Sequence, residues 1–397
     1  MPSTQRYFAP IDFRTRFPAL DGIRALAITM VFARHYGGGA HGGILLQIFN
    51  VIRRHGWSGV DLFFVLSGFL ITGILYDTRA DSHYFKRFFL RRAVRIFPVF
   101  YIVTAVLLLL TPVFQYEWHW GHLTFALYLG NLFANYNFDL YGIVSANHPT
   151  ASVSISHFWS LCVEEQFYLL WPLAIWFVRD RIRLIRIAVA LSILALALRL
   201  VMLWHFPLEV ATTWIFRTLP FRMDSLLIGG ILALVLRGPN ADRWQRSAKW
   251  VFLAAGAGCI AIFMLPAQVE YYWIDSIGLP LLAFASAGLI GSTLRAGSPA
   301  FRLFYLKPLR VLGKYSYGFY VYHLLFVSAW LQLLIWLQSR LHSLALSGLI
   351  ALPLNFAVTF LVSKLSYDLI EVRFLRLKRH FEYDSEVADH KHAFTTK

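Results

Sequence analysis

The stretch LDGIRALAITMVFARHYGG (residues 20–38) is the first apolar run of the chain, and its ionisable residues include Arg24 and His35. If this run is helical, the eleven steps between them return to nearly the same helix face, about 16 Å further along. An ionisable side chain inside a membrane span costs several kcal/mol, so by default it faces a cavity and indicates function. The pair predicts a polar track that runs into a membrane.

The composition of the whole chain supports a membrane protein. Apolar residues make up 58% of the 397 residues and charged residues only 15%, which is not typical of a soluble globular domain. Apolar runs long enough to cross a bilayer, about 20 residues each, recur from end to end. We therefore expect an all-α fold, a polytopic integral membrane helix bundle. The two cysteines, Cys162 and Cys259, lie in apolar segments and predict neither a disulfide framework nor a metal site.

The net charge of +16 is concentrated outside the apolar runs. In a membrane protein, basic loops set the orientation and meet anionic lipid or anionic cytosolic ligands, so this charge does not indicate nucleic acid binding. The candidate membrane segments lie near residues 19–38, 57–76, 96–115, 120–138, 158–178, 184–204, 217–236, 248–265, 274–294, 311–336 and 344–370.

The basic clusters test this count of eleven segments. They lie in the N-terminal tail, in the C-terminal tail and at 79–95, 179–186, 237–249 and 295–310. The positive-inside rule places all of them in the cytoplasm, which requires an even number of crossings between successive clusters. Three segments separate 79–95 from 179–186, and 116–157 contains no lysine or arginine. We therefore expect 120–138 to be a re-entrant or interfacial helix, which leaves about ten crossings.

This topology divides the chain into a cytoplasmic N-tail (1–17), a membrane domain (18–371) and a cytoplasmic C-tail (372–397). We expect a multi-pass protein of the inner (cytoplasmic) membrane with both termini in the cytoplasm. Since no separate soluble domain is predicted, the chemistry has to be done by the membrane bundle.

Arg24 and His35 are the first candidates for that chemistry. The topology places Arg24 near the cytoplasmic side and His35 deeper, and a histidine has a suitable pKa for a general base toward a hydroxyl. Arg92 and Arg95 lie three residues apart on one helix face at the cytoplasmic entrance of the third segment. Paired guanidinium groups suit phosphates, although an ordinary positive-inside loop explains them equally well.

Other apolar segments also carry ionisable residues. A structural role is the alternative for each, either an ion pair between helices or a hydrogen bond across them. A passive bundle has little reason to bear that cost repeatedly, so we expect these residues to support a site: Glu164 and Glu165, Asp61, Arg222 and Asp224, and Tyr320 and His323.

Six motifs together resemble the acyltransferase-3 family of membrane acyltransferases, and the likeness covers roughly residues 17–375. They are LDGIRALAITMVFARH (20–35), GVDLFFVLSGFLIT (59–72), RRAVRIFP (91–98), SLCVEEQFYLLWP (160–172), FRMDSLLIGG (221–230) and KYSYGFYVYH (314–323). The resemblance implies transfer of an acyl group, usually acetyl from acetyl-CoA, to a hydroxyl of a sugar or glycan. Family members modify lipopolysaccharide, exopolysaccharide, peptidoglycan or glycosylated small molecules.

The resemblance also implies roles for residues. The family's arginine–histidine motif falls on Arg24 and His35, its acyl-CoA-associated R-x-x-R motif on Arg92 and Arg95, and its acidic motif on Glu164 and Glu165. We expect His35, Arg24 and Glu164 to be catalytic, with Glu164 orienting His35 or the sugar. Some members carry a fused extracytoplasmic hydrolase-like domain, and we expect this chain to be the form without one.

We therefore expect an O-acetyltransferase whose partners are acyl-CoA, a glycan acceptor and membrane lipid, with no nucleic acid, no metal and no tightly bound cofactor. The main alternative is a proton-coupled transporter or exporter, which also buries charges but more often shows repeated halves; no such repeat is present here. A glycosyltransferase with a lipid-linked donor is a further alternative. Aromatic residues in 116–157 predict either a sugar-stacking surface or, more simply, an interfacial belt.

Overall fold

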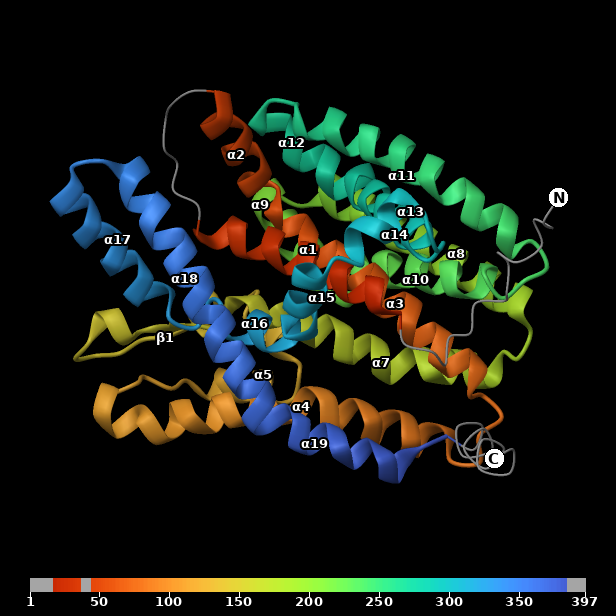
Figure 1. Cartoon of the computed structure of the whole chain (residues 1–397), viewed down its shortest axis with the longest axis horizontal. Coiled ribbons are helices and arrows are strands. Elements are labelled where there is room, and N and C mark those ends of the chain that lie inside the picture. Colours follow the sequence, from red (N-terminus) through yellow and green to blue (C-terminus); the bar gives the residue numbers. More distant parts are fainter. Residues whose placement is uncertain (1–16, 37–43, 384–397) are drawn as a thin grey trace.

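The computed structural model describes residues 17–36 and 44–383, and it is a bundle of long helices that run side by side (Figure 1). The all-α prediction is confirmed: β-structure in this part of the chain is limited to one antiparallel pair of two-residue strands, β1 (Gly142–Ile143) and β2 (Val153–Ser154), and an isolated bridge. The long helices are α1 (Pro18–Tyr36), α3 (Gly59–Asp77), α4 (Tyr84–Phe114), α7 (Trp159–Phe177), α8 (Arg181–His205), α10 (Leu219–Val235), α11 (Ala241–Phe263), α13 (Leu279–Thr293), α17 (Val327–Leu341) and α18 (Leu344–Ser366).

Several of these helices are long and apolar enough to cross a membrane. Six pass this test singly, and eight pass if two bent pairs count as one span each. The bent pairs are α9 (Leu208–Arg217) with α10, at 43°, and α16 (Ser316–Tyr322) with α17, at 74°. Helices α1 and α7 have 19 residues each but carry ionisable residues. Length and composition thus support six to eight of the ten predicted crossings.

The segment predicted not to cross, 120–138, breaks into short elements. These are η3 (Trp120–His122), α5 (Leu123–Ala126) and α6 (Gly130–Phe133), each of three or four residues. None is long enough to span a bilayer, which agrees with the prediction. The basic turns α3–α4, α7–α8 and α10–α11 lie at one end of the bundle, and the β1 hairpin lies at the other (Figure 1).

One region differs from the sequence-based expectation. The segment before α3 forms a further helix, α2 (Ile44–Arg54), which no prediction assigned. Its end is held by the Glu270 carboxylate of α12 (Ala267–Trp273), which pairs with Arg54 and His55. After α18 the chain stays helical as far as Phe381, through η8 (Tyr367–Glu371), α19 (Val372–Arg376) and η9 (Leu377–Phe381), and these turns pack on α4. The remaining tail predictions, for 1–16 and 384–397, lie outside the described residues.

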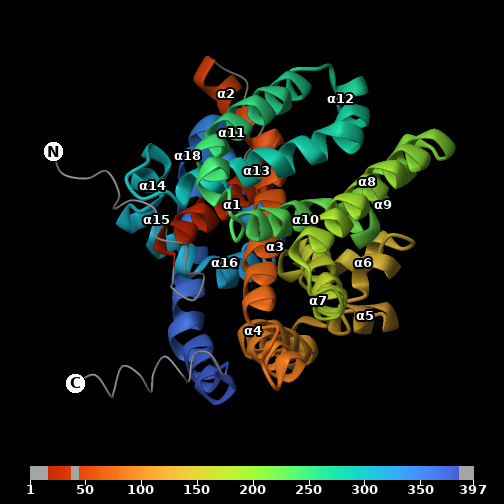
Figure 2. The ribbon, with the colours of Figure 1, turned by 90° about the vertical axis from the view of Figure 1, so that its right-hand side faces the viewer.

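Helices α1, α3 and α10 form the middle of the bundle, and the other long helices surround them (Figure 2). Glycines permit the close approach of α3 and α10. A Cβ atom at Gly68 would lie 1.8 Å from the carbonyl oxygen of Leu226, and one at Gly229 would lie 2.0 Å from that of Val65. This contact fixes the position of Ser67 and Asp61 on α3 relative to Arg222 on α10.

Replacing Gly68 with alanine is expected to destabilise the protein by about 1–3 kcal/mol, because the added methyl group has to push the α10 backbone away. Thermal unfolding of the purified protein in detergent measures the effect. Gly256 of α11 is the matched control, since a Cβ atom there meets nothing within 4 Å. A Gly68→Ala variant as stable as Gly256→Ala would contradict this packing.

Candidate active site: two cavities that meet at Tyr320

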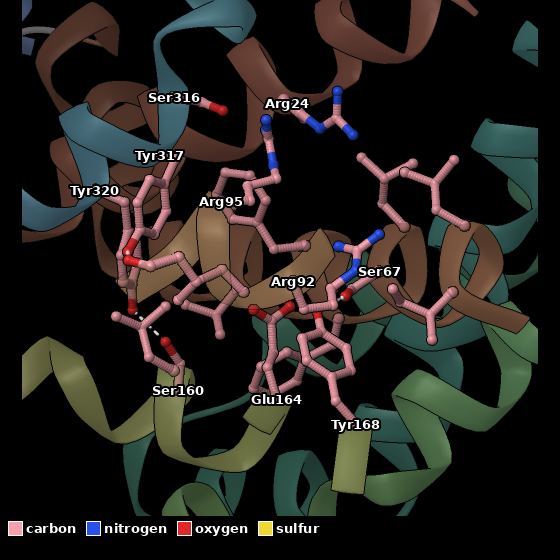
Figure 3. Close-up of a pocket in the computed structure, with 18 residues that line it drawn as sticks. Arg24, Ser67, Arg92, Arg95, Ser160, Glu164, Tyr168, Ser316, Tyr317 and Tyr320 are labelled. Carbon is pink, nitrogen blue, oxygen red and sulfur yellow. Dashed lines mark hydrogen bonds between the residues drawn. The ribbon is translucent and has the colours of Figure 1, made fainter. Parts of the chain in front are cut away.

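The first cavity, here named the arginine cavity, is lined by Arg24, Arg92 and Arg95 and has a volume of about 820 Å³ (Figure 3). Helix α1 supplies Arg24, α4 supplies the other two arginines, and α3, α7 and α16 supply the remaining wall. The three-residue spacing in α4 puts Arg92 and Arg95 on one face, as the sequence predicted. The predicted donor-binding pair and the predicted Arg24 are therefore brought together.

The charge of this cavity is only partly neutralised. Arg24 Nη1 donates to Asp21 Oδ1 at 2.5 Å. For Arg92 and Arg95, the structure of 17–36 and 44–383 shows no carboxylate within ion-pair distance. The Arg92 guanidinium carbon instead lies 5.7 Å from the centre of the Tyr168 ring. Two guanidinium groups thus keep donors available for an anion.

Glu164 of α7 supplies the carboxylate of the arginine cavity. It lies against the hydroxyl groups of Ser67 and Tyr168, and these two hydroxyls are hydrogen-bonded to each other. Figure 3 shows Glu164, Ser67 and Tyr168 together beside Arg92. Glu164 was expected to orient His35 or the sugar; the structure places it in the arginine cavity, which His35 does not line. Glu165 does not line this cavity, and its Oε1 is buried with no hydrogen-bond partner among the described residues.

The second cavity, here named the histidine cavity, is lined by His35 and His157 and has a volume of about 1390 Å³. His35 is exposed to it from the end of α1. Its Nδ1 lies 2.9 Å from the carbonyl oxygen of Val31. A carbonyl oxygen only accepts, so Nδ1 carries the proton and Nε2 keeps a free lone pair. The backbone of α1 thus sets the tautomer that a general base requires.

Three imidazole rings lie together beside this cavity. The His323 ring centre is 5.1 Å from that of His35 and 4.9 Å from that of His157. His323 Nδ1 lies 2.7 Å from the Tyr320 carbonyl oxygen, and His157 Nε2 lies 3.1 Å from that of Val321. Among the described residues, no three metal-binding side chains are grouped to hold an ion. Sequence reasoning missed His157, which lies in the 3-10 turn Ser156–Phe158 before α7.

The two cavities share two lining residues, Val60 and Tyr320, and so meet there. The Tyr320 hydroxyl donates to the His157 carbonyl oxygen at 2.8 Å and is hydrogen-bonded to Ser160, which lines the arginine cavity. The expected single track past Arg24 and His35 is therefore wrong in one respect. The residues line different cavities, because the Tyr320 ring from α16 lies between them.

The predicted supporting residues Asp61, Arg222 and Asp224 line neither cavity. They belong to a buried polar network. Arg222 Nη2 donates to Asp61 Oδ1 at 2.7 Å, and Arg199 Nη2 donates to Asp224 Oδ2 at 2.8 Å. Arg199 was not predicted, although it is the charged residue deep in the apolar segment 184–204. These pairs hold α3, α8 and α10 together behind the site.

The comparisons with known proteins identify the family of the chain. A family model described as an acyltransferase domain (Acyl_transf_3) matches residues 17–365. The chain is similar to the peptidoglycan O-acetyltransferase OatA of Listeria monocytogenes, with 29% identity over 94% of this chain and 57% of the relative. It is also similar to the O-acetyltransferase OatA of Staphylococcus aureus strain NCTC 8325, with 29% identity over 77% of this chain and 50% of the relative. The chain thus spans about half the length of these relatives, and no solved structure matches it.

Proposed function

The chain belongs to the acyltransferase-3 family, and from that premise we propose that it moves an acetyl group from acyl-CoA to a sugar hydroxyl of a cell-envelope glycan. The observation that carries this proposal is the pair of cavities. One offers free guanidinium groups, the other offers a histidine with a free lone pair, and they meet at a single tyrosine.

The arginine cavity suits the donor. Acyl-CoA carries a diphosphate and a further phosphate, and guanidinium forks bind such groups with paired hydrogen bonds. Arg92 and Arg95 have no carboxylate partner among the described residues, and the charge of Lys378 in η9 acts on both of them. The basic turns at this end of the bundle support a cytoplasmic position for the donor, because the positive-inside rule favours basic loops on that side.

The histidine cavity suits the acceptor. Nε2 of His35 takes the proton of the acceptor hydroxyl as its oxygen attacks the thioester carbonyl. The carbon–sulfur bond breaks, the acetyl ester forms, and the CoA thiolate leaves and is protonated to the thiol. The thioester has to reach the junction at Tyr320 for this step, so the phosphates stay near the arginines while the acyl end passes Ser160.

The relatives support a cell-wall glycan as the acceptor, since one of them is named a peptidoglycan O-acetyltransferase. The proposed location is the cytoplasmic membrane, with both ends of the chain in the cytoplasm. A peptidoglycan acceptor would then be reached from the opposite face, where the β1 hairpin lies.

Thiol release from acetyl-CoA by the purified protein tests the proposal. With a peptidoglycan disaccharide of N-acetylglucosamine and N-acetylmuramic acid as acceptor, we expect one thiol for each ester formed, the ester being detected by mass spectrometry. Movement of the disaccharide across proteoliposomes without thioester cleavage would favour the transporter instead and overturn the proposal.

Replacing Arg92 with glutamine is expected to raise the KM for acetyl-CoA by about 10- to 100-fold, since a hydrogen bond to a charged group contributes roughly 1.5–3 kcal/mol. Arg91→Gln is the matched control, because Arg91 stands next to it but donates to the Phe381 carbonyl oxygen outside the cavity. Equal effects of the two substitutions on KM would show that general positive charge, rather than the cavity arginine, binds the donor.

A further inference from the structure

The wall of the histidine cavity carries a carboxylate that the proposed reaction does not use. This residue, Asp275, lies in the π-helical turn Ile274–Gly278 that joins α12 to α13. Single π-helical turns of this kind are found frequently at functional sites. Asp275 is 3% exposed, and its Oδ2 is buried with no hydrogen-bond partner among the described residues.

Among the described residues, Asp275 has no hydrogen bond to the two arginines whose charges act on it. The charges that act on it most favourably are those of Arg222 and Arg199. Each of these arginines already donates to another carboxylate, Asp61 or Asp224. Asp275 is thus a third carboxylate beside two arginines, in a residue that lines the cavity, and its buried Oδ2 has no donor among the described residues. A buried acceptor without a donor costs free energy unless a ligand or water supplies the donor.

Arg217 lines the same cavity and is a hydrogen-bond donor, whereas Asp275 is an acceptor. Its Nη1 is buried without a hydrogen-bond partner among the described residues, and its guanidinium carbon lies 4.6 Å from the centre of the Tyr141 ring. The residues that line the cavity thus include a buried acceptor and a buried donor without partners among the described residues, and His35 with its free lone pair. Aromatic side chains complete its wall: Trp57, Trp159, Phe216 and Tyr271.

This combination fits a sugar ring. A pyranose has apolar ring faces that pack on aromatic side chains, and its hydroxyls donate and accept hydrogen bonds at once. A simple anion would use Arg217 but would be repelled by Asp275. A simple alcohol would use His35 and leave both other groups without partners.

We infer that the histidine cavity is the acceptor subsite for a glycan sugar ring, in which Asp275 accepts a hydrogen bond from a second hydroxyl of the ring that presents its reacting hydroxyl to His35. This inference rests on the proposed function for the reaction, but the binding it describes does not require acetyl transfer. Asp275 is a positioning residue: it fixes which hydroxyl of the ring reaches Nε2 of His35.

The alternative role for Asp275 is purely structural, as an additional counter-ion of Arg222 and Arg199. Glu270, five residues earlier in the chain, provides the matched control. It is a buried carboxylate, 1% exposed, that pairs with Arg54 and His55 and does not line the histidine cavity. Replacing Glu270 therefore shows how the loss of a structural buried carboxylate in this segment changes the Tm and the Kd.

The experiment is calorimetric titration of the purified protein with the disaccharide of N-acetylglucosamine and N-acetylmuramic acid, without acetyl-CoA, together with thermal unfolding. We expect Asp275→Asn to weaken disaccharide binding by about tenfold or more, with a Tm close to that of the wild type, because a neutral amide replaces a charged acceptor, whose hydrogen bonds are stronger. We expect Glu270→Gln to lower the Tm and leave the Kd unchanged.

Two results would overturn the inference. One is an Asp275→Asn variant that binds the disaccharide as the wild type does but unfolds at lower temperature, like Glu270→Gln. The other is the absence of disaccharide binding to the wild type. Binding that depends on Asp275, without thiol release when acetyl-CoA is added, would support the acceptor subsite and overturn the proposed transfer, so the two failures are distinguishable.

Discussion

Replacing His35 with alanine is expected to lower acetyl transfer to the glycan by about 100- to 10,000-fold, the usual contribution of a positioned general base. The reason is geometric. Donation from Nδ1 to the Val31 carbonyl oxygen fixes the free lone pair on Nε2, and the ring is exposed to the histidine cavity. The measurement is kcat from ester formation at saturating acetyl-CoA and disaccharide.

The KM for acetyl-CoA provides the internal control for this substitution. It is expected to change little, because the donor phosphates bind in the other cavity. His83, in the turn before α4, is a histidine that lines neither cavity, and His83→Ala is expected to retain full activity. Undiminished transfer by His35→Ala would exclude His35 as the base.

Replacing Arg222 with leucine is expected to destabilise the protein by about 3–5 kcal/mol, the cost of leaving a buried charge without its partner. Arg222 and Asp61 are both fully buried, and their ion pair joins α10 to α3. The measurement is thermal unfolding in detergent, with the yield of monodisperse protein as a second readout.

A second substitution separates lost pairing from lost packing. When Asp61 is also changed to asparagine, no unpaired carboxylate remains, so the double variant is expected to recover part of the stability lost by Arg222→Leu. A double variant less stable than Arg222→Leu alone would show that the pair does not carry this energy.

The sequence was sufficient to predict the fold class and several of the residues that line the arginine cavity. Apolar runs of membrane-spanning length have few alternatives to helices, and the helical spacing of Arg92 and Arg95 places both on one face. Glu164 also lines this cavity. Which cavity it faces could not be predicted, because the rotation of α7 about its axis depends on packing against neighbouring helices.

The division into two cavities could not be predicted from periodicity. It depends on Tyr320, which the bent pair α16–α17 places between helices remote in sequence, and on His157, which lies outside any long helix. Asp275 was not predicted as a site residue for a similar reason. A π-helical turn changes which face a residue occupies, and a 3.6-residue period does not reveal it.

The proposed separation of donor and acceptor can be measured in sealed proteoliposomes. The disaccharide is trapped inside one set of vesicles and supplied outside another, while acetyl-CoA, which does not cross the bilayer, is always added outside. A donor in the arginine cavity and an acceptor in the histidine cavity predict an acetyl ester on the trapped disaccharide and none on the external one. Acetylation of only the external disaccharide would contradict this arrangement.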